Sequence, residues 1–331
     1  YVTQALNHQV AHVCADIPIK GQEVEVALNV DEITHCMKQN FQEQVAFLAS
    51  AAKKQRSEVK EKNLTSEELK LFQNAKMKEI QSWLTTETVR RIARNQIPED
   101  QILRSRWVLT WKPVEPTEKD PSPPSKPKAR LVILGYEDPQ LESLARDSPT
   151  MGKDSRTLIL QFAASAKWKI RSFDIQTAFL RGSRQDGRIL GMEPPQEMRS
   201  LMNLKPWECC ELLKSAYGLV NAPLLWYEEL KSALLNLNFR MSPLDPCTFV
   251  LPRQDGKGIH GLVGVHVDDG LGAGDAIFEQ AIAQLEQRYP FGSKKESDFI
   301  FTGIHISQKW DGSIELDQTQ YIEDIPAIDI E

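Results

Sequence analysis

Apolar residues follow a helical spacing in the first quarter of the chain, from Val30 to Trp83. The positions that share one face of this predicted helix are Leu69, Phe72, Ile80 and Trp83. The sequence Thr65-Ser66-Glu67-Glu68 fits a capping box, with a glutamate three residues after the capping threonine. Residues 1–30 show mixed polarity and no sustained period. We therefore predict a partly helical leader over residues 1–60, followed by an amphipathic helix that packs on the next domain.

Two segments with the composition of strands flank a stretch that is rich in proline. Arg106–Trp111 and Ala129–Leu134 contain mainly apolar, aromatic and β-branched residues. Six prolines lie between positions 113 and 127, and proline cannot donate a hydrogen bond to a β-ladder. The pattern predicts two strands joined as a hairpin, with an extended loop at its tip.

From residue 154 onward, predicted helices and strands alternate. Asp154 or Ser155 can cap a first helix. Pro223 suits the first turn of a second helix, and Asp275 can cap a third. The core faces of the three helices are predicted at Leu158, Ile159, Phe162 and Ala166, at Tyr227, Leu230, Leu234 and Leu237, and at Phe278, Ile282 and Leu285.

The strands of this region are predicted at residues 169–175, 247–251, 260–267 and 299–306, with 271–273 as a hairpin partner of the third. Read from Lys169, the order is β-α-β-β-α-β. This is the split βαβ, or ferredoxin-like, arrangement. The sequence therefore predicts an α+β fold in which helices pack on an antiparallel sheet.

Composition narrows the class of protein. The chain has 331 residues, of which 41% are hydrophobic and 26% are charged, which is close to ordinary globular usage. This length suits two domains, or one domain with extensions. No run of 18 apolar residues occurs, and the first residues lack the basic stretch and apolar core of a signal peptide. We therefore expect an intracellular protein whose five cysteines are reduced thiols.

Histidine and cysteine gather near the N-terminus, at His8, His12, Cys14, His35 and Cys36. Such residues could bind zinc. Their spacing matches none of the paired-ligand templates, and two adjacent ligands are awkward for one tetrahedron. We favour a solvated or partly packed leader over a zinc site.

The net charge of the chain and its local charge give opposite indications about nucleic-acid binding. The formal net charge is −6, which argues against a protein that binds nucleic acid, because phosphate binding needs Lys and Arg. Residues 101–135, which include the predicted hairpin, carry seven Lys and Arg against three acidic residues. The positive charge is therefore concentrated in one segment of an acidic chain.

Three carboxylates form a candidate metal site. Asp268 and Asp269 follow an apolar strand and precede Gly270, so they are predicted to lie in a turn, either as ordinary turn residues or as ligands of a divalent cation. Asp174 closes the strand that starts at Ile170. In a ferredoxin-like sheet the first strand and the central hairpin are neighbours. The three carboxylates can then face one another and hold two metal ions, as in phosphoryl transfer.

Five segments together resemble copia-type LTR-retrotransposon reverse transcriptases, and they occur in the order of that family over about residues 76–325. They are Lys128–Val132 with Gly135-Tyr136 (fingers motif), Phe173–Gly182 (first catalytic motif), Lys214–Tyr227 (template grip), His266–Asp269 (aromatic-x-Asp-Asp) and Phe299–Ile304 (near the end of the palm). The resemblance implies a ferredoxin-like polymerase palm with a fingers subdomain and an N-terminal helical extension.

The resemblance also implies domain bounds. Fingers and palm would occupy residues 61–325, with the fingers at about 76–165 plus part of 180–222, the palm at about 166–180 and 223–310, and the start of a truncated thumb or connection at 311–331.

The resemblance implies a role for each matching residue. Asp174, Asp268 and Asp269 would bind two Mg²⁺ ions, with Mn²⁺ as an alternative, and Asp269 would do so less directly. The backbone of Ile175 would be a further metal ligand. The remaining residues would be Lys128 and Arg130 at the triphosphate, Phe179 at the 2′ position of the sugar, Tyr217 and Gly218 below the templating base or nucleotide, His266 and Val267 at the primer end, and Lys294 or Lys295 as general acid. For the last two, the simpler interpretation is a pair of solvated lysines.

The sequence departs from the family pattern at three places. His266 stands where the family usually has tyrosine, so the charge of this residue would vary near neutral pH. Val220-Asn221 replaces the usual Lys-Gln and removes a positive charge near the template. The chain stops at Glu331, where the thumb should begin, and no RNase H or integrase segment is visible. Weak template grip and low processivity are the expected consequences.

The resulting prediction is an RNA-directed DNA polymerase domain of a copia-type retroelement Pol polyprotein. It would transfer deoxynucleotides from their triphosphates to a primer 3′-hydroxyl on an RNA or DNA template. We expect it in the cytoplasm, within a virus-like particle, or in the nucleus, and we expect no membrane partner. One alternative is an inactive relic that keeps the fold and weak nucleic-acid binding. Another is a different ferredoxin-like metal enzyme, such as a nucleotide cyclase, which leaves the segments at 128–132 and 217–223 unexplained.

Overall fold

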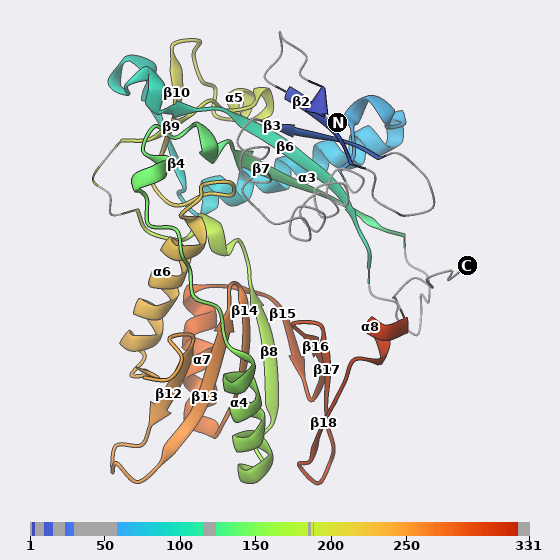
Figure 1. The fold of residues 1–331 in the computed structure, drawn as a ribbon. Coiled ribbons are helices and arrows are strands. Elements are labelled where there is room, and N and C mark those ends of the chain that lie inside the picture. The colour runs from blue at the N-terminus through green and yellow to red at the C-terminus, as the bar shows by residue number, and fades with distance from the viewer. Residues whose placement is uncertain are drawn as a thin grey trace. The chain divides into compact units, whose positions relative to one another are not determined.

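The structure is a computed structural model (Figure 1). It describes residues 58–114, 124–184, 187 and 189–323, together with the backbone of three strands closer to the N-terminus. The chain divides into two units, Tyr1–Ile80 with Trp107–Leu131 and Gln81–Arg106 with Val132–Glu331. Each unit is described by itself.

The first unit contains β-structure where a leader was predicted. Strands β1 (Val2–Thr3), β2 (Val10–Ala15) and β3 (Val24–Asn29) form an antiparallel sheet in the order β1-β2-β3. The prediction missed these strands because each is at most six residues long and mixes polar with apolar positions, which leaves no sustained period. Residues 30–57, where the helical pattern starts, lie outside the described part of the chain, as do the side chains of the predicted zinc-site candidates.

Helix α3 (Ser66–Thr85) follows a short 3-10 turn, η1 (Glu61–Asn63), and begins at the predicted capping box. The backbone N–H of Thr65 donates to Glu68 Oε2 at 2.9 Å, and the N–H of Glu68 donates to Thr65 Oγ1 at 3.3 Å. These two bonds satisfy N–H groups that have no partner within a helix. Phe72, Ile80 and Trp83 are buried on the predicted face.

Strands β6 (Ser105–Lys112) and β7 (Lys126–Ile133) pair as the predicted hairpin. The tip of this hairpin, residues 115–123, lies outside the described residues. In the first unit, Phe72 of α3 packs with Leu109 and Ala129 of the two strands, and its ring meets that of Trp111 edge to face at 4.8 Å. Trp107 and Trp111, the aromatic residues from which this strand was predicted, therefore pack in the same cluster as Phe72 of α3.

The second unit contains a small sheet in the order β4-β10-β9-β5. Its strands are β4 (Val89–Ala93), β5 (Ile102–Leu103), β9 (Gly191–Met192) and β10 (Glu208–Leu212), with η2 (Arg94–Gln96), η3 (Glu99–Gln101) and α5 (Gln196–Leu201) between them. The turns η4 (Gly135–Glu137) and η5 (Leu141–Ser143) come before the larger sheet.

The larger sheet has six strands in the order β11-β12-β13-β14-β8-β15, and Figure 1 shows most of them side by side. They are β8 (Ile170–Ile175), β11 (Arg240–Met241), β12 (Thr248–Pro252), β13 (Ile259–His266), β14 (Asp269–Gly274) and β15 (Phe291–Glu296). Strand β14 is antiparallel to both β13 and β8 and lies between them. This is the split βαβ arrangement within an α+β fold, as predicted.

The last strand of the ferredoxin-like order was placed wrongly. It is β15, which pairs with β8, and not the segment 299–306. That segment turns at Thr302 and Gly303, which both have positive φ, and forms the hairpin of β16 (Asp298–Phe301) and β17 (Ile304–Gln308), to which β18 (Ile314–Asp317) adds; α8 (Thr319–Glu323) follows. A pair of left-handed residues is the usual geometry of a two-residue hairpin turn.

Helices α4 (Lys153–Ala166) and α7 (Ala276–Arg288) cover opposite faces of this sheet. A Cβ on Gly264 of β13 would meet Ile159 of α4, whereas one on Gly261 would meet Phe278 of α7, and these two positions of a strand face opposite sides. The Asp275 carboxylate caps α7 as predicted, accepting from the N–H groups of Ile277 and Phe278.

Two predictions for α4 were wrong. In α6 (Ala222–Asn236), Pro223 lies in the first turn as predicted and Tyr227, Leu230 and Leu234 are buried, but Leu237 lies just beyond the end of the helix. Gly152, not Asp154 or Ser155, is the residue that caps α4. The buried face of α4 is Ile159, Leu160 and Ala163, and Leu158 and Phe162 are exposed. Residues 158–160 are all apolar, so their pattern could not show which stripe would meet the sheet. In the described residues, no helix has both the length and the apolar character needed to cross a bilayer.

Candidate functional site

The three carboxylates meet at one end of the six-stranded sheet. Asp269 is the first residue of β14 and pairs directly with Asp174, near the end of β8. Residues that pair directly across antiparallel strands present their side chains on the same face, with Cβ atoms about 4.5–5.5 Å apart. The N–H of Ile175 donates to the carbonyl of Asp268 at 2.9 Å. The hairpin that carries Asp268 and Asp269 is therefore joined to β8 beside Asp174.

The connection between β13 and β14 is only two residues long, Val267 and Asp268, because His266 pairs with Asp269. Asp269 thus begins a strand instead of lying in the predicted turn. Val267 has a φ of 62°, in the left-handed region that β-branched residues avoid. Its carbonyl accepts a hydrogen bond from Trp226 Nε1 at 2.7 Å. His266 Nδ1 is buried and has no hydrogen-bond partner in the described structure.

A glycine leaves room for the Asp174 carboxylate. Gly292 lies in β15 between the pairs Phe291–Ile175 and Ser293–Asp174, so it is the extra residue of a β-bulge. A Cβ atom at this position would lie 2.6 Å from Asp174 Oδ2. The prediction from sequence did not include Gly292. The only signal in the sequence is a glycine inside a polar segment, Phe291–Glu296.

The carboxylates repel one another. Burial raises the pKa of Asp269, and together with the negative charges of Asp268 and Asp174 it brings this pKa to about 6. Oxygen donors of this kind suit hard cations such as Mg²⁺. As the side chains stand, no three His, Cys, Asp or Glu residues in the described part of the chain are arranged to hold a metal ion. The carboxylates fit a cation that also takes ligands from water and substrate phosphates, which is how Mg²⁺ is usually held.

The raised pKa of Asp269 predicts a pH dependence of stability for the metal-free protein. A carboxyl group with a pKa near 6 when folded and 3.8 otherwise keeps its proton better in the folded state. Its contribution to stability is therefore full below about pH 4 and is lost as the pH rises through about 6. Asp269→Asn should raise the free energy of unfolding at pH 7 by about 1–2 kcal/mol, allowing for the exposed part of the side chain. Chemical denaturation of both proteins at pH 4 and pH 7, with chelator, measures this, and equal stability at pH 7 would contradict it.

The structure brings Phe179 and Tyr217 together. Phe179, in η6 (Ala178–Leu180), meets the Tyr217 ring edge to face at 5.7 Å. The Ser215 hydroxyl donates to the Phe179 carbonyl at 2.6 Å, and the Ser215 N–H donates to the Gly182 carbonyl at 2.8 Å. The turn after the first catalytic motif is thus bound to the segment predicted as the template grip.

Gly218 is needed for close backbone contact. Its φ is 92°, and a Cβ there would lie 2.0 Å from the carbonyl oxygen of Ile133. The N–H of Ile133 in turn donates to the carbonyl of Tyr217 at 2.7 Å. No other residue type would let these two segments approach in this way.

The lysine and arginine residues predicted to bind or protonate phosphate lie on two different strands. Lys128 and Arg130 lie at alternate positions of β7 in the first unit, with Lys128 half-buried and Arg130 exposed. Lys294 and Lys295 lie on β15 beside β8, and Lys294 Nζ is 2.8 Å from Glu286 Oε2 of α7. Both lysines are therefore strand residues, paired with Phe173 and Ser172.

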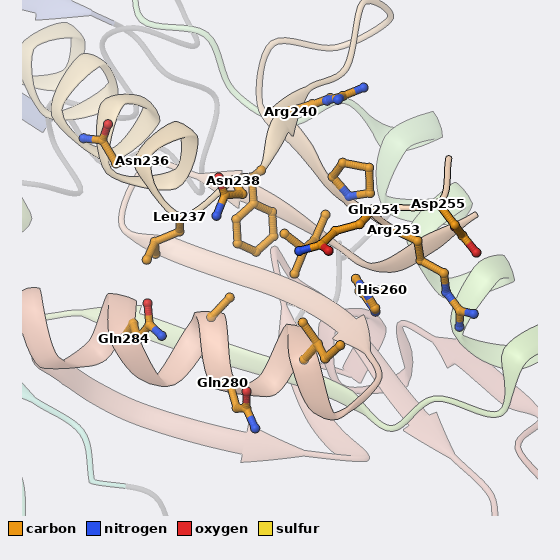
Figure 2. Close-up of a pocket in the computed structure, with 15 residues that line it drawn as sticks. Asn236, Leu237, Asn238, Arg240, Arg253, Gln254, Asp255, His260, Gln280 and Gln284 are labelled. Atoms are coloured by element: carbon orange, nitrogen blue, oxygen red, sulfur yellow. The ribbon is translucent and has the colours of Figure 1, made fainter. Parts of the chain in front are cut away.

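A hollow lies away from the carboxylates, at the other end of β13, where α6, α7 and the turn after β12 meet (Figure 2). Leu237, Phe239 and Ala281 line its apolar part, and side-chain amides such as Gln280 and Gln284 surround them. None of the predicted site residues lines it.

Comparison with known proteins gives one family match and several relatives. Residues 94–328 match the family described as reverse transcriptase (RNA-dependent DNA polymerase). The chain is 32% identical over 219 residues to a retrovirus-related Pol polyprotein from transposon RE1 of Arabidopsis thaliana, covering 63% of this chain and 14% of that protein. It is 33% identical over 234 residues to the one from transposon RE2 of the same plant, covering 70% and 15%. The chain thus spans about one-seventh of the length of these relatives.

Among solved structures, the chain is similar to a foamy viral protease-reverse transcriptase determined in complex with double-stranded DNA. The sequence identity is 10% and the TM-score is 0.39, and the match covers 72% of this chain and 34% of the other.

Proposed function

The chain belongs to the reverse transcriptase (RNA-dependent DNA polymerase) family, and on that premise we propose that it adds deoxynucleotides to the 3′ end of a primer on an RNA template. The predicted resemblance to copia-type elements is confirmed by its relatives, which are retrovirus-related Pol polyproteins from plant transposons. The observation that carries the proposal is the meeting of Asp174, Asp268 and Asp269 at one end of a split βαβ sheet.

In this proposal Asp174 and Asp268 hold two Mg²⁺ ions, with Mn²⁺ as a substitute and the Ile175 backbone as a further ligand. Bound metal would neutralise charge on the reacting phosphate and lower the pKa of the primer hydroxyl. Asp269 acts less directly, through the negative charge that it adds beside the other two carboxylates. The clearance that Gly292 leaves around Asp174 supports this assignment, because a carboxylate that binds metal must be free to turn toward it.

The chain's own residues would then bind and orient the substrates, since phosphoryl transfer depends mainly on position and charge. Lys128 and Arg130 are proposed to contact the triphosphate, where the planar guanidinium suits bidentate binding of phosphate. Tyr217 and Gly218 are proposed to lie below the nucleotide, and His266 and Val267 to contact the primer end. Lys294 or Lys295 is proposed to protonate the leaving pyrophosphate.

Phe179 is proposed to exclude ribonucleotides, because its ring, held against Tyr217, would occupy the space that a 2′-hydroxyl needs. Phe179→Val should raise the ratio of ribonucleotide to deoxynucleotide incorporation by about tenfold or more. Single-nucleotide extension with each triphosphate measures that ratio. Phe162→Val, at an exposed phenylalanine of α4, is the matched control. A ratio that stays the same in Phe179→Val would refute the assignment.

A primer-extension assay tests the proposed function as a whole. The protein is incubated with an RNA template, an annealed DNA primer, the four deoxynucleoside triphosphates and Mg²⁺. Extension that stops on addition of chelator supports the proposal. Binding of the primed template without extension, at saturating Mg²⁺ and protein, would contradict it and favour a relic that keeps only the fold.

A further inference from the structure

The turn that carries Asp268 has an unfavourable backbone conformation. In a two-residue hairpin connection whose first residue has positive φ, that residue is usually Gly, Asn or Asp. Here it is Val267, with a φ of 62°. A β-branched residue in the left-handed region is strained and keeps this conformation only when its surroundings impose it. Some neighbouring group must therefore hold the turn in place.

Trp226 is that group. Its indole N–H donates to the carbonyl oxygen of Val267 at 2.7 Å, and its side chain is completely buried in α6. A buried indole N–H needs an acceptor, and a carbonyl at a tight turn needs a donor. One hydrogen bond satisfies both and fixes the direction of the peptide group between Val267 and Asp268.

The Trp226 ring also packs against a second aromatic residue. The Tyr289 ring meets it edge to face at 5.5 Å and 90°. The Tyr289 hydroxyl donates to Glu229 Oε1 at 2.5 Å, and the Ser183 hydroxyl donates to Glu229 Oε2 at 2.9 Å. Arg288 NH2 also lies 2.9 Å from Glu229 Oε1. The Tyr289 ring therefore limits the movement of the indole, whereas the Glu229 contacts join α6 to the end of α7 and to the segment after β8.

We infer that Trp226 is a positioning residue that holds the strained Val267 turn, and through it places Asp268 beside Asp174. The link to Asp174 is the next peptide group, because the carbonyl of Asp268 accepts from the N–H of Ile175, directly after Asp174. The consequence for metal binding rests on the proposed function. The consequence for the turn does not, because it follows from the backbone contacts alone.

Amide hydrogen exchange of the full chain, measured without metal or nucleotide, tests the inference. Trp226→Phe keeps an aromatic ring at the buried position, though a smaller one, and removes the donor. The amide of Ile175 and those of residues 266–269 should then exchange about 2- to 10-fold faster, as expected for the loss of one hydrogen bond. The amides at the Leu262–Ala273 pair, further along the same two strands, should keep their rates.

Tyr289→Phe is the matched control, because it removes one hydrogen bond to Glu229 but keeps the ring that packs on Trp226 and the Trp226 donor. It should not accelerate exchange at Ile175 or in the turn. If Trp226→Phe changes no rate, or accelerates both ends of the hairpin equally, Trp226 is an ordinary core residue and the inference is overturned.

A second variant separates positioning from packing. Glycine adopts positive φ without strain, so in a Val267→Gly background the turn no longer needs to be held. There, Trp226→Phe should change the exchange rate of Ile175 by less than about twofold. An effect as large as that in the Val267 background would overturn the inference, because loss of packing alone would then explain it.

Mn²⁺ titration followed by electron paramagnetic resonance relates the turn to the metal site. Trp226→Phe should weaken binding about 2- to 10-fold, and Tyr289→Phe should not. If the unmodified chain binds no Mn²⁺, the proposed metal site is wrong, and the exchange experiment still decides the role of Trp226. If the unmodified chain binds Mn²⁺ and Trp226→Phe binds it equally well, Asp268 is not placed by Trp226.

Discussion

Replacing Asp174 or Asp268 by asparagine is expected to lower the rate of primer extension by at least about a thousandfold. Asparagine keeps nearly the same shape but carries no charge, so it binds Mg²⁺ weakly and cannot offset the positive charge of two ions. The structure places both residues where β8 meets the β13–β14 hairpin. The N–H of Ile175, the residue after Asp174, donates a hydrogen bond to the carbonyl of Asp268. Single-turnover extension with saturating primed RNA and Mg²⁺ measures the rate of the chemical step.

Asp154→Asn is the control for this experiment, since Asp154 is an exposed aspartate of α4 and its loss should leave the rate within twofold. Asp269→Asn should have an effect between these two extremes, because Asp269 is proposed to act through its charge instead of direct ligation. Equal extension by Asp268→Asn and the unmodified protein would show that the carboxylates are not the catalytic site.

Gly292→Ala is the second change with a large expected effect, a loss of about 10- to 100-fold in the extension rate. The new methyl group would lie 2.6 Å from Asp174 Oδ2, a distance that real Cβ contacts do not show. The carboxylate must therefore turn away from β15, or β15 must move at its bulge. The side chain keeps its charge, so the variant separates the position of Asp174 from its chemistry.

Gly152→Ala is a matched control, because the added Cβ would lie 3.5 Å from Asp245 Oδ2, which is an ordinary van der Waals distance. The same single-turnover assay applies, with thermal unfolding to show that both variants are folded. An extension rate for Gly292→Ala equal to that of the unmodified protein would show that the space beside Asp174 is not needed for catalysis.

The sequence was enough to predict that Asp174, Asp268 and Asp269 lie near one another, for a physical reason. Two apolar strands each end in aspartate, and buried strands do not tolerate unpaired charge, so the charges had to gather at the ends of the strands. The split βαβ order then brought those ends together. The hairpin partner of β13 and the caps of α3 and α7 were also predictable, because each depends on residues that are close in sequence.

The supporting residues were not predictable in the same way. Strand β15 is a mostly exposed edge strand whose residues, apart from Phe291, give no alternation of apolar and polar positions, so both the strand and its glycine bulge were missed. Trp226 had the pattern of a core aromatic residue on a helix, and its hydrogen bond to a turn about 40 residues later depends on tertiary packing. The buried stripe of α4 was missed because three adjacent apolar residues offer more than one face.

The pairing of β8 has a consequence for how the chain folds. Its two neighbours in the sheet, β14 and β15, come roughly 95 and 120 residues later in the sequence, so these contacts raise the contact order of the chain. Closing loops of this length costs entropy before the sheet returns any stabilisation. During synthesis, Asp174 emerges long before its partners and remains a single exposed carboxylate. The ability to bind metal should therefore appear in one late step, together with completion of the sheet and not with formation of the helices.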